Sequence, residues 1–132
     1  MDFIGLELRA TPNQYLLCPP GMETKATAHG ESPTFAIPAD RLLEAWRRVA
    51  LREPRVSMVR EDRETGQCDF VQRSLIFRFP DTITVQVVPI DDDRSTCAVY
   101  SRSSYGRGDL GVNRRRVGRW LRLVQAEVSA GP

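Results

Sequence analysis

The sequence has almost no lysine or histidine: beside 18 arginines it contains one lysine, Lys25, and one histidine, His29. A hydroxyl or thiol nucleophile needs a nearby base, and His29 is the one imidazole that could serve as such a base. His29 lies in a segment rich in proline and glycine, and no G-x-S-x-G elbow surrounds the serines near position 101. The sequence therefore gives little support to a hydrolase with a nucleophile–histidine pair.

Cysteine is also scarce. Cys18, Cys68 and Cys97 are far apart and odd in number, and none belongs to a C-x-x-C pair. Structural zinc sites normally draw on closely spaced ligand pairs, so we predict no metal site and no cofactor. Free, buried thiols in a reducing compartment are the expected state of these three residues.

Long apolar runs are absent as well, so we predict no membrane span. The first ten residues, MDFIGLELRA, lack the basic start and the apolar stretch of a secretory signal, which favours the cytoplasm. A chain of 132 residues is predicted to form a single domain over residues 1–132, with an extended N-terminal segment at 1–33 and a core at 34–128. The sequence indicates no particular oligomeric state.

The charges are unevenly distributed along the chain. Residues 94–122 contain eight arginines and one acid, Asp109, a net charge of +7, whereas residues 1–93 have a net charge of −4. Such asymmetry is typical of a surface that faces an anion. A basic helix lying over acidic loops of the same chain would produce it too, and the excess of arginine over lysine also fits the codon usage of a GC-rich genome.

Hydrophobic periodicity predicts two amphipathic helices, one over about residues 39–51 and one at the C-terminus. The second has an apolar stripe at Val117, Trp120, Leu121, Val124 and Val128. Alternation of apolar residues predicts strands at 34–37, 55–61, 68–79, 82–90 and 95–102, and a weak edge strand within 1–11. Residues 11–30, rich in proline and glycine, are expected to form a long surface loop pinned by Tyr15, Leu16 and Leu17.

Short turns join the four strands that follow the first helix, so these strands should form an antiparallel meander. Each helix has one apolar stripe and needs a sheet face to cover. The predicted fold class is therefore α+β: an antiparallel four- to five-stranded β-meander with two helices packed on one face, in the order strand, helix, four strands, helix.

Arg73 interrupts the apolar face of its predicted strand, which it shares with Val71, Leu75 and Phe77. A guanidinium on such a face needs a partner, because an unpaired buried charge is costly. Asp81 and Asp109 are candidate partners. A purely structural ion pair, or an arginine that reaches past the edge of the sheet to water, would explain the pattern equally well.

The stretch from Ser101 to Leu121 is unusually polar. It combines three glycines at 106, 108 and 111 with two good helix N-cap residues, Asp109 and Asn113. The surrounding arginines, Arg102, Arg107, Arg114, Arg115 and Arg116, would make an anion-binding cradle at a helix start. The glycine spacing matches neither the phosphate-binding loop nor the dinucleotide fingerprint. A helix cap locked by an Asp–Arg pair is the alternative.

The sequence YSRSSYGRGDLGVNRRRVGRWL resembles the signature of the bacterial and plastid domain-of-unknown-function family 1499, which is close to S-R-S-x-x-G-x-x-D-x-G-x-N-x-x-R. The matching positions are Ser101, Arg102, Ser103, Gly106, Asp109, Gly111, Asn113 and Arg116. The segments PNQYLLCPP, SPTFAIP, Phe70–Ser74 and Arg78–Asp81 also resemble this family, so the likeness covers nearly the whole chain. The family carries no established activity. The resemblance implies that Arg73, Arg102, Asp109, Asn113 and Arg116 belong to one polar cluster.

These observations favour a non-enzymatic binding or assembly module, whose arginine-rich corner binds an anionic small molecule or a protein surface. We expect its ligand-binding residues to be Arg73, Arg102, Asp109, Asn113 and Arg116, and we predict no catalytic residue. The alternative is an enzyme for a phosphorylated or carboxylated substrate with Asp109 as acid or base, which would need a concave pocket. Nucleic-acid binding is a third, weaker hypothesis, because no recognised motif is present and the net charge is only +2.

Overall fold

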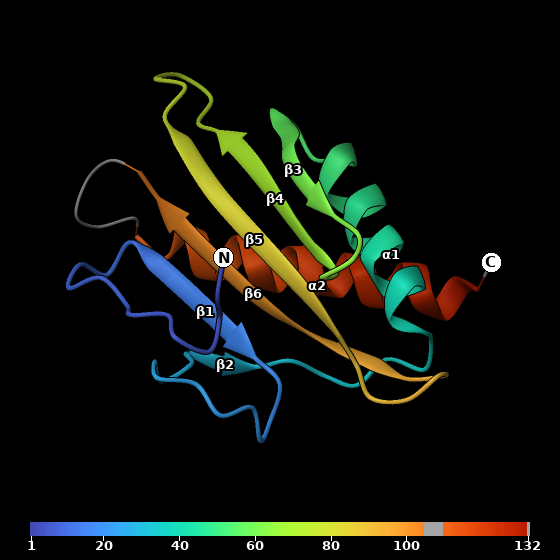
Figure 1. The fold of residues 1–132 in the computed structure, drawn as a ribbon. Helices are drawn as coiled ribbons and strands as arrows, with labels where there is room; N and C mark the ends of the chain where they lie inside the picture. Colours follow the sequence, from blue (N-terminus) through green and yellow to red (C-terminus); the bar gives the residue numbers. More distant parts are fainter. Residues whose placement is uncertain (105–109, 132) are drawn as a thin grey trace.

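The computed structural model describes residues 1–104 and 110–131, which form a six-stranded sheet and two helices (Figure 1). The strands are β1 (Gln14–Cys18), β2 (Gly30–Glu31), β3 (Val56–Asp62), β4 (Gln67–Arg73), β5 (Pro80–Pro89) and β6 (Ser95–Ser103). From edge to edge they follow the order β2-β1-β6-β5-β4-β3. β1 and β2 pair in parallel, and all other neighbours are antiparallel. The predicted α+β class is confirmed, with six strands in place of four or five.

Strands β3 to β6 form the predicted meander because connections of four to six residues separate their alternating apolar residues. The turn between β3 and β4 is closed by a hydrogen bond from the Gly66 amide to the Asp62 carbonyl, 2.9 Å. Gly66 has φ +74°, and a Cβ atom there would lie 2.8 Å from the side chain of Val87. Both conditions require glycine at this turn.

Helix α1 (Ala39–Arg52) begins directly after Pro38, whose φ of −61° suits the start of a helix, and ends before Pro54. Helix α2 (Val112–Ala130) follows the meander. The two helices lie on the same face of the sheet, called here the inner face (Figure 1). Both helices thus bury the apolar stripes that their sequences display.

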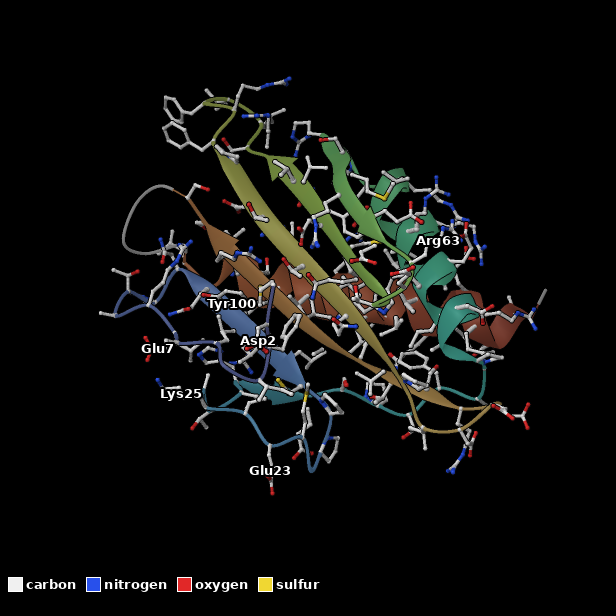
Figure 2. The ribbon with its side chains drawn as sticks, in the orientation of Figure 1. Asp2, Glu7, Glu23, Lys25, Arg63 and Tyr100 are labelled. Carbon is white, nitrogen blue, oxygen red and sulfur yellow. The ribbon has the colours of Figure 1, made fainter. Side chains whose placement is uncertain are left out.

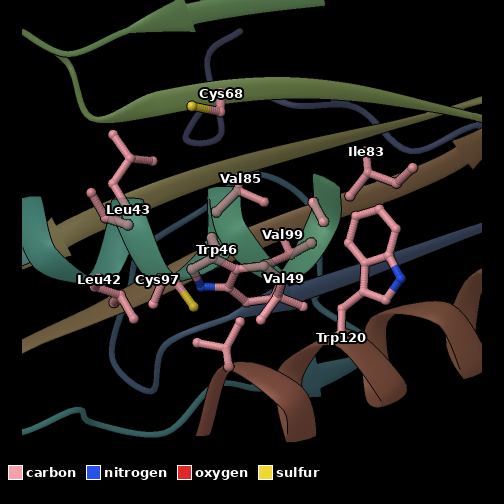
Figure 3. Packing of buried hydrophobic residues seen from close by; sticks show 14 of the residues in the cluster. Leu42, Leu43, Trp46, Val49, Cys68, Ile83, Val85, Cys97, Val99 and Trp120 are labelled. Carbon is pink, nitrogen blue, oxygen red and sulfur yellow. The ribbon is translucent and has the colours of Figure 1, made fainter. Parts of the chain in front are cut away.

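The main core fills the space between the inner face and the helices (Figure 3). Trp46 of α1 and Trp120 of α2 are buried to 1% exposure or less. The ring of Trp120 packs edge-on against Phe70 of β4, with centroids 6.2 Å apart and an interplanar angle of 85°. Ile83, Val85, Cys97 and Val99 complete this layer from β5 and β6. The central space of the domain is therefore occupied by side chains.

A second, smaller cluster lies on the opposite, outer face of β1 and β6. It consists of Phe3, Leu16, Cys18, Ala98 and Tyr100. The start of the chain crosses this face, where the terminal amino group donates to Gln67 of β4, 2.7 Å. Lys25 and Glu7 form an exposed ion pair beside this segment (Figure 2). The N-terminal residues thus cover part of a sheet face that the helices do not reach.

The sequence-based expectation for residues 1–33 is wrong in two respects. No strand forms within 1–11, and the apolar patch at Tyr15–Leu17 is the middle of β1, which pairs with β6. The prolines at 12, 19 and 20 do not interfere because they flank the strand and leave its ladder donors intact.

Two other expected strands are shorter in the structure. Within 34–37 only Phe35 pairs, through an isolated bridge to Ser95. The strand expected over 68–79 ends at Arg73, and the remaining residues form the connection to β5. In the described part of the chain, no helix is long and apolar enough to cross a membrane. No group of metal-binding side chains comes together among the same residues.

The three cysteines are free and buried, as expected. Burial raises the pKa of the Cys97 thiol to about 12 and that of Cys68 to about 11, and it also raises the pKa of Cys18. Burial has this effect because it disfavours the charged thiolate. The thiolate is the reactive form of cysteine, so none of the three is poised as a nucleophile.

We therefore expect all three thiols of the native protein to resist Ellman's reagent near pH 8, and to react together once urea unfolds the chain. The folded-state pKa of Cys97 is raised, so the stability gained by burying its neutral thiol is present at neutral pH. That stability is lost as the pH rises from the ordinary value of 9.0 toward about 12. Thiol titration of native and unfolded protein makes the test, and rapid labelling of native protein would contradict this account.

Candidate functional site

A buried ion pair links the start of α2 to the sheet. The Nη2 of Arg116 donates to Asp81 Oδ2 at 2.6 Å, and its Nε donates to Gln72 Oε1, also at 2.6 Å. Gln72 and Asp81 are paired neighbours on β4 and β5, so one guanidinium spans both strands. The side chains of Arg116 and Asp81 are only 9% and 16% exposed. Because both side chains are largely buried, removal of either charge would leave the other buried and uncompensated, at a high cost in stability.

Asn113 joins three separate parts of the chain to this ion pair, and it is completely buried. Its Oδ1 accepts hydrogen bonds from Ser101 Oγ at 2.6 Å and from Arg116 Nη1 at 2.9 Å. Its Nδ2 donates to Ser103 Oγ at 3.0 Å and to the Asn13 carbonyl at 3.2 Å. A single amide therefore connects α2, β6 and the residue before β1.

We call this group the inner polar cluster; it consists of Gln72, Asp81, Ser101, Ser103, Asn113 and Arg116. Its donors and acceptors are directed at one another, and its main charges are paired. Buried polar networks of this kind fix the relative positions of the elements they join. The cluster therefore acts as a structural joint between α2 and the sheet.

Arg102 lies on the other side of the sheet. Neighbouring residues of a strand point to opposite faces, so Arg102 of β6 points outward while Ser101 and Ser103 point inward. Its Nη1 donates to Thr84 Oγ1 at 2.7 Å and to the Tyr100 carbonyl at 3.0 Å, and its guanidinium lies 4.9 Å from the Tyr100 ring centre. Burial lowers the pKa of Arg102, and the charge of Asp69 partly offsets this effect.

Arg73 is exposed, contrary to the expectation of a buried charge on an apolar face. The strand ends at this residue, so Leu75 and Phe77 belong to the connection to β5 and are exposed too. The Nη1 of Arg73 donates to the carbonyl of Arg78 at 3.0 Å. Arg73 thus closes a turn, and none of the acids in the described part of the chain pairs with it.

The structure brings together only part of the cluster that the resemblance implied. Asn113 and Arg116 are in direct contact, Arg102 is on the opposite face, and Arg73 is at the exposed end of β4. Asp109, expected as a cap, ion-pair partner or acid–base group, lies outside the described residues.

A surface hollow lies beside the start of α2, close to Asn113 but open to solvent. It has a volume of about 780 Å³ and is called here the α2 hollow. The described residues that line it are 8–12, Gln14, Tyr15, His29, Leu110, Gly111 and Arg114. They include two arginines and one histidine but no carboxylate. Charge of one sign therefore gathers around a concave site.

The wall formed by residues 8–12 is held in place by Gln14. The side chain of Gln14 donates to the carbonyls of Arg9 and Thr11 at 2.7 and 3.0 Å and accepts from the Arg9 amide at 3.2 Å. Tyr100 also donates to Gln14, at 2.6 Å. The guanidinium of Arg9 reaches the carbonyl of Ser103 on β6. The sequence does not indicate this wall, because residues 1–33 are expected to form an extended N-terminal segment with a surface loop.

No serine or cysteine is hydrogen-bonded to the histidine in the described part of the chain. The hydroxyls of Ser101 and Ser103 are hydrogen-bonded to Asn113. The Nδ1 of His29 accepts a hydrogen bond from the Leu16 amide at 2.9 Å, and its ring stacks on Tyr15 at 5.5 Å. His29 lines the same surface hollow as Cys18, but its side chain is hydrogen-bonded to the backbone of β1 and to no serine or thiol in the described part of the chain.

Comparison with solved structures identifies the fold. The di-domain aromatase/cyclase BexL of the BE-7585A biosynthetic pathway superposes with a TM-score of 0.55 and 15% identity over 76% of this chain and 46% of that one. The chain thus spans about half the length of BexL. The Zhui aromatase/cyclase from Streptomyces sp. R1128 gives a TM-score of 0.52 and 15% identity over 74% of this chain and 90% of that one. At this identity the likeness shows a helix-grip-like fold alone.

Comparison with curated proteins gives no match. The family comparison does, over residues 11–124, which include β1 to β6, α1 and most of α2. The match thus contains the inner polar cluster and much of the α2 hollow. The chain belongs to DUF1499, a family of proteins of unknown function.

Proposed function

We propose that the protein is a non-enzymatic binding module of the cytoplasm, and that it binds an anionic small molecule in the α2 hollow. One observation carries the proposal: Arg9, His29 and Arg114 border a hollow of about 780 Å³ whose described lining has no carboxylate. This volume is in the usual range of small-molecule sites. A concave site of this size favours a small ligand over a flat protein surface.

The two arginines of the hollow, unlike eight other arginines, form no ion pair with a described residue. In the described part of the chain, eight arginines form ion pairs: Arg47, Arg48, Arg52, Arg60, Arg63, Arg94, Arg116 and Arg119. Arg9 and Arg114 are not among them. Arg114 also belongs to the first turn of α2, which contains no acid. Because the start of a helix already carries partial positive charge, an anion bound there would be stabilised by the helix and by Arg114 together.

Several features favour binding over catalysis. The thiols are buried with raised pKa values, and the inner polar cluster is internally paired. The neighbours in fold are aromatase/cyclases by description. An activity of that kind would need room for an organic substrate within the fold, whereas Trp46, Trp120 and Phe70 fill the layer between sheet and helices here. Buried free thiols also fit a reducing compartment such as the cytoplasm.

Thermal unfolding with added pyrophosphate or citrate tests the proposal, with chloride at equal ionic strength as the reference. A ligand that binds only the folded state, present at a concentration of about five times its Kd, stabilises the protein by about 1 kcal/mol. This raises the Tm of a domain of this size by roughly 3–6 °C. We expect one of these probes to raise the Tm of the parent protein by such an amount. Arg9→Gln and Arg114→Gln should each remove most of that increase.

Arg122→Gln is the matched control, because Arg122 is an exposed arginine on the same helix, away from the hollow. This variant should keep the full increase in Tm. An increase that is equal in all variants would contradict the proposal, as would no increase with either probe. If the increase in Tm depends on Arg9 and Arg114, native mass spectrometry of protein purified from its own host would identify the retained anion by its mass.

A further inference from the structure

The connection between β4 and β5 exposes four large apolar side chains that belong to neither hydrophobic cluster. Leu75, Ile76, Phe77 and Phe79 are 71%, 78%, 72% and 48% exposed. This connection lies at the end of the sheet where β4 stops and β5 begins (Figure 1). We call these four residues the apolar tip. Scattered apolar side chains are normal on a protein surface, but a contiguous group usually marks an interaction site.

The apolar tip is held in a defined shape by its own backbone. The amide of Ser74 donates to the Phe79 carbonyl at 3.0 Å, and the amide of Phe79 donates to Ser74 Oγ at 2.9 Å. The rings of Phe77 and Phe79 stack with centroids 5.5 Å apart. These hydrogen bonds pair polar groups at the two ends of the connection with each other, so these groups do not need water as a partner. The free-energy cost of placing the connection in an apolar medium is therefore lower.

The charges around the apolar tip are positive. Residues 70–80 contain Arg73 and Arg78 and no acid. Arg55 lies beside them, since its Nε donates to the Arg73 carbonyl at 2.9 Å. The next acid, Asp81, is already paired with Arg116. A group of exposed aliphatic and aromatic side chains with arginines beside it has the chemistry of a segment that enters a bilayer while its arginines contact lipid phosphates.

We propose that the apolar tip docks the protein on a membrane surface rich in anionic lipids. Leu75, Ile76 and Phe77 enter the acyl region, and Arg55, Arg73 and Arg78 contact the headgroups. Charge complementarity favours an anionic lipid surface as the binding partner, because anionic lipids attract each arginine that lies near the membrane surface. The site is separate from the α2 hollow, so neither proposal depends on the other.

Sedimentation with lipid vesicles tests the inference. The full chain should bind vesicles of phosphatidylcholine mixed with phosphatidylglycerol, and bind those of phosphatidylcholine alone about tenfold more weakly. Ile76→Asp and Phe77→Asp should each lower the affinity for the mixed vesicles by at least about tenfold. Arg73→Gln combined with Arg78→Gln should reduce the preference for phosphatidylglycerol.

Ile90→Asp is the matched control, because Ile90 is 44% exposed at the turn after β5, at the other end of that strand. It should bind vesicles like the parent, and thermal melts should show that all variants fold. The inference is overturned if the parent does not bind the mixed vesicles, or if the tip variants bind like the parent. It is also overturned if the chain forms dimers without lipid that Phe77→Asp dissociates, since the tip would then bind a second copy.

Discussion

Replacing Arg116 by methionine is expected to lower the free energy of unfolding by about 3–5 kcal/mol. The substitution keeps most of the apolar length of the side chain but removes the guanidinium that contacts Asp81, Gln72 and Asn113. Asp81, only 16% exposed, would then lose its compensating charge. A domain of this size has about 5–15 kcal/mol of stability in total, so the loss is a large share of it. Urea unfolding of parent and variant measures the difference.

Two further measurements separate the buried pair from a general effect of losing an arginine. Asp81→Asn combined with Arg116→Met should cost less than the sum of the single changes, because the two charges interact directly. Arg94→Met breaks the pair with Asp91, in which both side chains are exposed, at 56% and 47%, and should cost far less than Arg116→Met. Equal losses for Arg116→Met and Arg94→Met would contradict a buried structural pair.

Asn113→Ala is expected to cost roughly 2–4 kcal/mol, because it removes one hydrogen-bond partner from each of several buried groups. The hydroxyls of Ser101 and Ser103 and the carbonyl of Asn13 all contact this amide. Alanine has a high helix propensity, so the helix itself gains slightly and the loss comes from the broken contacts. Urea unfolding, followed by both tryptophan fluorescence and circular dichroism, gives the difference in free energy.

Gln125→Ala provides the comparison, since Gln125 is an exposed amide residue on the same helix. This substitution should leave stability unchanged within about 0.5 kcal/mol. If Asn113→Ala behaves in the same way, the inner polar cluster does not hold α2 on the sheet.

The helices and the meander could be predicted because each has an apolar period that matches its geometry. The stripe of α1 around Trp46 and that of α2 around Trp120 bury as expected. β1 could not be predicted, because five residues between prolines have too little pattern to indicate a strand. Its stability comes from pairing with β6, more than eighty residues away in the sequence, and such a long-range contact leaves no local signal.

The candidate site was predicted in part for similar reasons. The signature around Asn113 and Arg116 indicated a polar cluster, and the structure contains one. Asp81 was named in advance as a partner for Arg73, but it pairs with Arg116 because strand alternation turns Asp81 toward the helices. The same alternation sends Arg102 to the outer face. The α2 hollow combines Arg9 and Arg114, which the sequence separates by most of the chain, so only the fold shows that they lie together.

The central claim is that Arg116 of the inner polar cluster, which is paired with Asp81, has a structural role. Arg9 and Arg114 of the α2 hollow, which form no ion pair with a described residue, bind the anion. A pyrophosphate titration followed by proton–nitrogen NMR tests this claim most directly. The spectra of the parent protein should include the arginine Nε–Hε signals. The account predicts saturable shifts at Arg9, His29 and Arg114 and an unchanged Nε–Hε signal at Arg116. Saturable shifts centred on Arg116, or no saturable shift at the hollow, would contradict it.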